Sequence, residues 1–260
     1  MQHERRRQTG SVTFVTITAN KTADLGGLAI HYRETGSPGG TPVVALHGHP
    51  GAPGTWDEVA AGLCASGRYR FIAVTQRGYR ASGRAESYSL EALRDDVFSF
   101  ADALGLGQFV LIGHSMGGVV AGLAAELNPD RLIALVLEDS VPPRDGLDMP
   151  IPPRPDGELP FDWALVPAIF GQLASPDPAW WKQLSRITVP TLVLGGGSTS
   201  HVPQDLLAEA VKQMPAGRLV SLEGAGHTAH QTQPDRFLAE VTSFLDGQGL
   251  RAAQRPDGLA

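Results

Sequence analysis

The stretch of residues 109–123 constrains the fold more than any other part of the sequence. A short apolar run ends at Gly113, and a second apolar run, with helical spacing, begins just after Gly117. The five residues from one glycine to the other read Gly-His-Ser-Met-Gly. A sharp turn between a strand and a helix leaves little room for side chains two residues either side of its tip. The pattern therefore predicts a strand, a strained turn with Ser115 at its tip, and a helix.

Ser115 has the surroundings of a reactive group. G-x-S-x-G between a strand and a helix is typical of a nucleophile elbow. The N-terminal N–H groups of the following helix would point toward Ser115 and favour negative charge on a reacting oxygen. The alternative interpretation is a glycine-rich turn with a capping serine, and the flanking strand and helix favour the nucleophile.

Strand-like and helix-like segments alternate along the chain. Strands are predicted at 12–18, 28–33, 42–46, 70–74, 109–113, 132–137, 191–194 and 218–222. Helices are predicted at about 55–65, 89–104, 117–127, 204–213 and 234–245. Ser89 fits the N-cap of the second helix, and Gly105 fits the position after its end. This alternation is typical of an α/β fold with a doubly wound, mostly parallel sheet.

Residues 141–187 interrupt the alternation. Seven prolines between 142 and 160 exclude a sheet or helix interior there. Large aromatics follow in weakly helical patterns: Phe161, Trp163, Phe170, Trp180 and Trp181. A connection of about 45 residues is far longer than usual. We expect a small Pro-rich, aromatic lid insertion whose aromatic side chains bind substrate, and a floppy excursion is the alternative.

These boundaries divide the chain into four parts. We expect a flexible N-terminus at 1–11, a core formed by 12–140 and 188–246, the lid insertion at 141–187, and a flexible tail at 247–260. The net charge of −6 argues against nucleic acid and against an anionic membrane surface. No apolar run follows the basic N-terminus, and none approaches the length of a membrane span, so a cytoplasmic protein is expected.

Three motifs occur in an order that resembles the α/β-hydrolase superfamily. They are His47-Gly48-His49-Pro50, the elbow around Ser115, and Gly224-Ala225-Gly226-His227. The resemblance extends over about residues 12–246 and implies the α/β-hydrolase fold. The loop at 77–82 is similar to the D-x-R-G-x-G-x-S loop of the family. It lacks the aspartate and has Arg80 at the second glycine, but this loop is structural in the family.

The resemblance implies a triad of serine, histidine and acid. Ser115 would be the nucleophile, and a serine hydroxyl needs an adjacent base at neutral pH. His227 is the expected base, because it lies in a glycine-bounded loop just after the last predicted strand. His230, three residues further on, is its positional rival.

The acid is less obvious. Most members of the family carry it after the strand that is here 191–194, but the loop at 195–203 contains no carboxylate, and Asp205 belongs to the next predicted helix. Glu138 and Asp139 end the preceding strand, which opens onto the same edge of the sheet. Some haloalkane dehalogenases and lactonases of the superfamily carry their acid there. Alignment with them favours Asp139, with Glu138 as the alternative, and the acid would orient the imidazole.

The same layout implies an oxyanion hole of two backbone N–H groups. One belongs to Met116, which follows the nucleophile, and the other to His49, in the loop after an earlier strand. Two such donors would stabilise the tetrahedral intermediate. A purely backbone role for His49 is as well supported as one in which its side chain lines the pocket.

The nucleophile narrows the chemistry. Dehalogenases and epoxide hydrolases of this fold use aspartate at the position of Ser115, and none of the tyrosines lies in the lid to activate an epoxide. We therefore expect a serine esterase or lactonase that forms an acyl-enzyme on a small apolar or aromatic ester or lactone, with no cofactor and no metal. Thioester or carbon–carbon cleavage stays open. The competing interpretations are a ligand-binding receptor or inactive homologue, and a cofactor-free perhydrolase.

Overall fold

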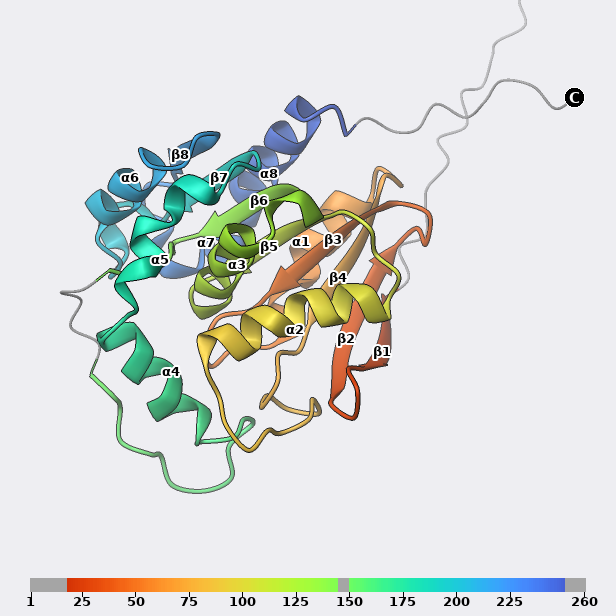
Figure 1. The fold of residues 1–260 in the computed structure, drawn as a ribbon. Coiled ribbons are helices and arrows are strands. Elements are labelled where there is room, and N and C mark those ends of the chain that lie inside the picture. The colour runs from red at the N-terminus through yellow and green to blue at the C-terminus, as the bar shows by residue number, and fades with distance from the viewer. Residues whose placement is uncertain (1–17, 145–149, 251–260) are drawn as a thin grey trace, which may run out of the picture.

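The computed structural model describes residues 18–144 and 150–250. Within these residues, eight strands form one sheet in the order β1-β2-β4-β3-β5-β6-β7-β8. The strands are β1 (Thr18–Asp24), β2 (Ala29–Gly36), β3 (Thr41–Leu46), β4 (Tyr69–Val74), β5 (Phe109–His114), β6 (Leu132–Glu138), β7 (Thr191–Gly195) and β8 (Gly217–Ser221). Pairing is antiparallel between β1, β2 and β4 and parallel from β4 to β8. The predicted doubly wound, mostly parallel sheet is confirmed (Figure 1).

Helices cover both faces of the sheet (Figure 1). They are α1 (Asp57–Cys64), α2 (Leu90–Ala103), α3 (Met116–Leu127), α4 (Leu165–Ala174), α5 (Pro178–Lys182), α6 (Gln204–Val211), α7 (Ala229–Thr232) and α8 (Pro234–Gly247). Buried side chains of α2, α3 and α6 share one apolar cluster, while those of α1 and α8 share a second cluster on the other face. The two clusters give the three-layer arrangement that a parallel sheet needs to bury both of its faces.

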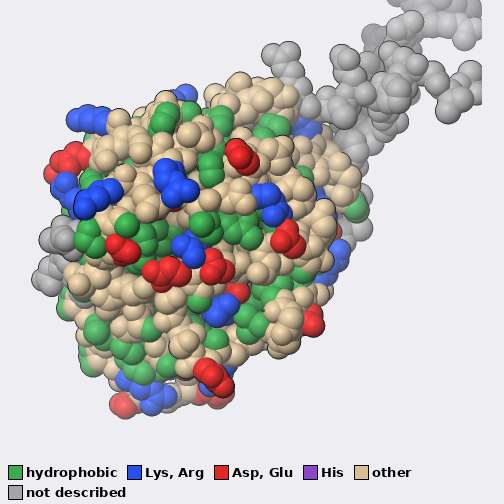
Figure 2. All heavy atoms as spheres, in the orientation of Figure 1, with side chains coloured by type: hydrophobic (Ala, Val, Ile, Leu, Met, Phe, Trp, Pro, Cys, Tyr) green, Lys and Arg blue, Asp and Glu red, His purple; other side chains and the backbone are tan. Residues whose placement is uncertain are grey.

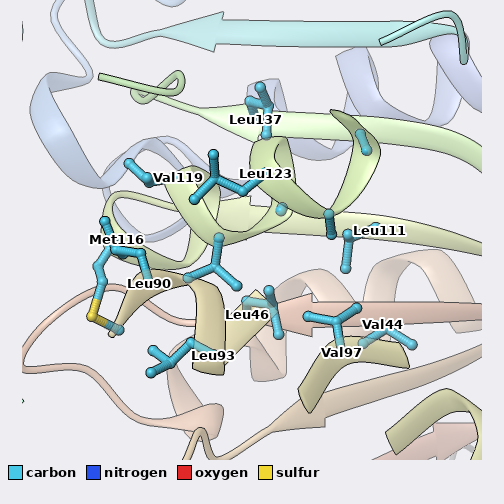
Figure 3. Packing of buried hydrophobic residues seen from close by; sticks show 14 of the residues in the cluster. Val44, Leu46, Leu90, Leu93, Val97, Leu111, Met116, Val119, Leu123 and Leu137 are labelled. Atoms are coloured by element: carbon cyan, nitrogen blue, oxygen red, sulfur yellow. The ribbon is translucent and has the colours of Figure 1, made fainter. Parts of the chain in front are cut away.

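The first cluster holds the elbow in place. Figure 3 shows Val119 and Leu123 of α3 in the same cluster as Leu90 and Leu93 of α2. Leu111, beneath α3, belongs to β5, the strand that leads into Ser115, and is fully buried. Since both arms of the turn are anchored in one tightly packed core, the strained turn between them is held by burial on either side.

Local signals set the ends of α2. The Ser89 side chain accepts a hydrogen bond of 3.0 Å from the backbone N–H of Ala92, as its predicted N-cap role requires. Gly105, just past the helix, has a φ of +65°, a conformation that glycine adopts without strain. Both predictions for this helix are confirmed.

The N-terminal edge differs from the prediction. The predicted strand at 12–18 lies almost wholly outside the described residues, and the edge strand instead occupies Thr18–Asp24. This strand is polar, Thr-Ala-Asn-Lys-Thr-Ala-Asp, and most of its residues are exposed, so no apolar alternation marks it. This segment is held in the extended conformation by its backbone pairing with β2, which its side-chain pattern does not predict. At the other end, α8 continues two residues past the predicted Leu245, to Gly247.

The insertion between β6 and β7 contains α4, α5 and a short 3-10 turn at Leu184–Arg186. Side chains from all three join the apolar cluster that covers α2 and α3, with Ile169 and Leu184 fully buried. Phe161 forms an isolated β-bridge with Tyr79. The part of the insertion from residue 161 to residue 187 is therefore packed on the core, whereas residues 150–158 are exposed and form no helix or strand.

Charged side chains of both signs are interspersed over the face shown in Figure 2. On that face no large field of one sign develops, in keeping with the small net charge of −6. Among the helices of residues 18–144 and 150–250, none combines the length and apolar character needed to cross a membrane.

Glu126, at the end of α3, makes the stability of the fold depend on pH. Burial raises the pKa of this carboxyl from 4.5 to about 8, although Arg186 and Arg94 oppose the shift. The fold therefore favours the protonated acid. Its contribution to stability is complete below the unfolded-state pKa of 4.5 and is lost as the pH rises through about 8.

We expect Glu126→Gln to flatten this dependence, because the amide stays neutral. Between about pH 5 and about pH 9, the melting temperature of the variant should fall less than that of the wild type, as followed by circular dichroism. Parallel curves for the two proteins would contradict the assignment.

Candidate active site

Ser115 lies at the tip of the turn between β5 and α3, with a φ of +52°, in the left-handed region that non-glycine residues rarely adopt. A Cβ on Gly113 would lie 2.3 Å from the carbonyl oxygen of Gly117, and one on Gly117 would lie 2.6 Å from that of His47. Both glycines are thus required by close backbone contact, for the reason that the motif predicted. The strain at Ser115 marks the turn as a functional feature.

His227 and Asp139 are joined by a direct hydrogen bond. The Nδ1 of His227 lies 2.7 Å from Oδ2 of Asp139, whose side chain is fully buried, while the imidazole is partly exposed. Since an ionised carboxylate only accepts, Nδ1 carries the proton and donates, which leaves Nε2 bare to accept one. Ser115, His227 and Asp139 line the same pocket. The carboxylate–imidazole pair that a serine–histidine–acid triad needs is therefore present, in the pocket that Ser115 lines.

Asp139 is held ionised by its neighbours. Burial alone would raise its pKa, but the hydrogen bond from His227 and those from the loop after β7 together lower it below the ordinary value. The backbone N–H of Gly196 donates at 2.9 Å and the Gln204 amide at 3.0 Å, and the Ser200 hydroxyl also donates. The loop that lacks a carboxylate, together with the first residue of α6, thus supplies the donors that stabilise one. The sequence does not predict these three donors, and only Ser200 belongs to the polar Gly-Ser-Thr-Ser run that could signal them.

Glu138, the alternative acid, faces a different histidine. Its Oε2 lies 2.7 Å from Nδ1 of His230, and its Oε1 accepts the backbone N–H of His230 at 2.8 Å. The two side chains are almost completely buried. The alternative acid and the rival histidine of the sequence analysis are therefore paired with each other, apart from the pair formed by Asp139 and His227.

The two predicted oxyanion donors belong to Met116, which follows Ser115, and to His49, whose neighbour Gly48 lies close to Ser115. Met116 is the first residue of α3, where N–H groups have no partner within the helix. Gly48 is so close to the nucleophile that a Cβ on it would lie 2.9 Å from Cβ of Ser115, which brings the adjoining His49 N–H to the same site. Neither N–H donates to an acceptor among the described residues. An oxyanion hole formed by these two N–H groups stays a prediction.

The loop at 47–51 is held by buried hydrogen bonds. The Nδ1 of His47 donates to the carbonyl oxygen of Gly48 at 2.8 Å, and its Nε2 accepts the N–H of Gln76. Burial lowers the pKa of His47 to about 4, so the ring stays neutral and keeps both bonds. The ring of His49 hydrogen-bonds the Tyr79 hydroxyl at 2.7 Å, so its side chain also helps to fix the loop.

A pocket of about 500 Å³ opens beside Ser115. Its polar lining consists of Ser115, Asp139, Ser140, His201 and His227. The remaining lining residues are apolar: Met116, Val119, Val141, Pro143, Leu173, Val202, Pro203 and Leu206. Burial is the main cause that lowers the pKa of His201, and the charge of the adjacent His227 lowers it further. The neutral ring is therefore favoured. Among the described residues that line the pocket there is no lysine or arginine. An uncharged ligand therefore suits this pocket.

The five aromatic residues predicted to bind substrate are distributed around the insertion. Phe161 and Phe170 have ring centroids 4.8 and 5.6 Å from His49. Trp180 is buried in the core cluster, and Trp163 and Trp181 pack against it. None of the five is among the residues that line the pocket, where the insertion contributes Val141, Pro143 and Leu173. A substrate contact through the aromatics stays a prediction.

His114, Glu138 and His230 form a buried cluster whose potential metal ligands lie within 4.8 Å of one another. Hydrogen bonds already engage this set. His114 Nε2 donates to the carbonyl oxygen of His227 at 2.7 Å, and the carboxylate accepts two N–H groups of His230. A nitrogen that carries a proton offers no lone pair to a metal ion. The hydrogen bonds thus engage one nitrogen of each histidine, and Nε2 of His230 has no partner among the described residues.

Comparisons with known proteins agree with this architecture. Residues 43–240 match a model of the alpha/beta hydrolase family. The chain is 26% identical to an sn-1-specific diacylglycerol lipase of Mus musculus over 92% of the chain and 93% of that protein. It is 27% identical to a non-heme chloroperoxidase of Streptomyces lividans over 84% of the chain and 96% of that protein.

Among solved structures, 2-hydroxy-6-oxo-6-phenylhexa-2,4-dienoate hydrolase from Rhodococcus sp. strain RHA1 superimposes with a TM-score of 0.76 at 20% identity, over 89% of this chain and all of that one. At this identity the likeness concerns the fold. The match of the family model over most of the chain is more specific, and it agrees with the sheet order and the elbow. The chain therefore belongs to the alpha/beta hydrolase family.

Proposed function

We propose that the protein is a serine hydrolase that cleaves a carboxylic ester or lactone through an acyl-enzyme on Ser115. The observation that carries the proposal is the hydrogen bond of 2.7 Å from His227 to a buried, ionised Asp139, in the pocket that Ser115 lines. A histidine held in this tautomer can act as the general base for the serine. The similarity to a diacylglycerol lipase, an ester hydrolase by name, supports the same class of bond.

In the proposed reaction, the Ser115 oxygen attacks the ester carbonyl while Nε2 of His227 takes the serine proton. The negative charge on the carbonyl oxygen is stabilised by the N–H groups of Met116 and His49. Collapse of the intermediate breaks the bond to the alcohol, which leaves with the proton from His227. Water then attacks the acyl-enzyme with the same base and releases the carboxylic acid and free Ser115. Asp139 stays ionised throughout and steadies the imidazolium.

The pocket supports an uncharged, largely apolar acyl group. Its volume of about 500 Å³ accommodates on the order of 15 non-hydrogen atoms, taking about 30 Å³ for each as for a water molecule in the liquid. Aliphatic side chains from the insertion, α3 and α6 form most of its wall. A carboxylate within this wall would be buried without a cationic partner, which is unfavourable.

A panel of p-nitrophenyl esters tests the proposal. We expect kcat/KM to rise along the series from acetate to octanoate, and to fall at least about a hundredfold when the acyl chain ends in a carboxylate. The matched pair is the octanoate ester and the monoester of octanedioate. Absence of turnover across all neutral esters and lactones would contradict ester hydrolysis.

The pocket assignment predicts a change in chain-length preference. Leu173→Trp on α4 should fill the pocket and lower kcat/KM for octanoate at least about tenfold, while acetate changes by less than about twofold. Leu127→Trp is the matched control, since Leu127 is 48% exposed at the far end of α3. If octanoate and acetate decline together in Leu173→Trp, the acyl chain lies elsewhere.

A second candidate is a perhydrolase, favoured by the similarity to a non-heme chloroperoxidase. The same acyl-enzyme would be attacked by hydrogen peroxide in place of water and would release a peracid. If the protein forms peracid from acetate and hydrogen peroxide at a higher rate than it hydrolyses esters, the perhydrolase activity is favoured. Both candidates need Ser115, His227 and Asp139, so the triad variants cannot separate them, whereas the two product assays can.

A further inference from the structure

Two adjacent carboxylates at the end of β6 hold two histidines that lie three residues apart. Asp139 accepts from the side chain of His227, and Glu138 accepts from the side chain and the backbone of His230. The two histidines lie on consecutive turns, Gly226–Thr228 and α7. The first pair belongs to the proposed triad. The second pair has no part in that chemistry, yet it is the more deeply buried.

The pair of Glu138 and His230 has a defined geometry. Nδ1 of His230 lies 2.7 Å from Oε2 and 2.9 Å from Oε1, and the backbone N–H lies 2.8 Å from Oε1. The His230 ring stacks on Trp56 with centroids 4.3 Å apart and planes at 25°. The other ring nitrogen, Nε2, is buried without a partner in the described residues. Such a pair holds one ring orientation, because rotation of the ring would break the bond from Nδ1 and leave the buried carboxylate with the backbone N–H alone.

The same pair is linked to both reacting residues. The carbonyl oxygen of Glu138 accepts the N–H of Ser115 at 3.2 Å. His114, the residue before the nucleophile, lies with its ring centroid 5.0 Å from that of His230 and donates from Nε2 to the carbonyl oxygen of His227 at 2.7 Å. The backbone that carries the base is therefore tied at its own carbonyl group to His114, at the end of β5, and again three residues later to Glu138, at the end of β6.

We propose that Glu138, His230 and His114 are positioning residues that fix the His227 loop against the elbow, so that Nε2 of His227 meets the Ser115 oxygen. The inference rests on the proposed triad and adds a second carboxylate–histidine pair to it. Positioning of this kind has large effects, since a displacement of about 1 Å can cost about a hundredfold in rate. Asp139 orients the imidazole ring, whereas the second pair sets the place of the backbone from which that ring extends.

Three variants test the proposal by their rates per titrated active site. Glu138→Gln removes the charge and keeps the shape, and should lower kcat about tenfold while KM changes by less than about twofold. His230→Leu removes the ring donor and should lower kcat at least as much. His230→Asn retains an N–H donor where Nδ1 lies, and should stay within about threefold of the wild type. Titration with a fluorophosphonate counts competent sites, so a loss of folded protein does not enter the rates.

The control is Glu126→Gln, which removes another buried carboxyl at the opposite end of α3 and should leave kcat unchanged. The rate of fluorophosphonate labelling at Ser115 should fall in parallel with kcat, because that reaction also needs the base. Wild-type kcat per site in Glu138→Gln, or equal losses in His230→Asn and His230→Leu, would overturn the proposal. If Glu138→Gln fails to fold, the comparison of His230→Asn with His230→Leu tests the proposal by itself. Absence of labelling in the wild type would instead refute the triad itself.

Discussion

Asp139→Asn is expected to lower kcat by roughly three to four orders of magnitude while the protein stays folded. The asparagine is nearly isosteric, and its amide oxygen can still accept from the Gly196 N–H. Its charge, however, is lost, and its NH₂ group can replace the carboxylate oxygen that faces His227. The imidazole would then accept through Nδ1 and carry its proton on Nε2, where it cannot take one from Ser115.

Steady-state assays on an ester identified by the panel measure this effect, with circular dichroism as the check on folding. Asp205→Asn is the matched control, because it makes the same change at the first carboxylate after the loop where most of the family carries the acid. It should be close to neutral. If Asp139→Asn stays near wild-type activity while Asp205→Asn or Glu138→Gln collapses, the acid has been assigned to the wrong position.

Ser115→Ala should have the largest effect of all, a loss of roughly six orders of magnitude in kcat. The change removes the nucleophilic oxygen and leaves the pocket, the two N–H donors and His227 in place. Substrate should therefore still bind, with a Kd near the wild-type KM where chemistry is slow. The φ of +52° at this position adds a second expectation, because the strain serves only the placement of the hydroxyl.

Ser115→Gly should raise the melting temperature above that of Ser115→Ala, since glycine adopts a positive φ without penalty. Both variants should be inactive. Activity within about a hundredfold of the wild type in either variant would show that another group attacks the substrate.

Much of the fold could be predicted because its signals are local. The apolar run before Gly113, the glycines of the elbow and the Ser89 cap each determine the backbone within a few residues of themselves. The strand at Thr18–Asp24 gave no such signal, because an exposed edge strand needs no apolar face. Its order comes from hydrogen bonds to β2, a contact made across the chain.

The same distinction applies to the site. The placement of Asp139 and His227 followed from motif order and from the rule that parallel strands end at one edge. The lining of the pocket did not follow, because it depends on how the insertion packs on α3 and α6. Large aromatics in a proline-rich segment favoured a substrate pocket, yet the structure places Trp180 in the core cluster. Composition alone does not distinguish packing from binding.

The pairing of Glu138 with His230 was also beyond the sequence. In the sequence, Glu138 and His230 are the alternatives to Asp139 and His227, because their positions fit nearly the same motif order. Adjacent residues at a strand end point in different directions, so Glu138 and Asp139 reach different partners. Only the packing of α7 against the sheet shows which histidine each one meets.

Covalent labelling of Ser115 is the most direct test of the account. An excess of a fluorophosphonate probe is added to the full chain, and the site of attachment is located by peptide mass spectrometry. A single adduct on the peptide that contains Ser115, absent from Ser115→Ala and formed much more slowly by Asp139→Asn, is the predicted result. An adduct that persists in Ser115→Ala, or no adduct on the folded wild type, would contradict the assignment of Ser115 as the nucleophile.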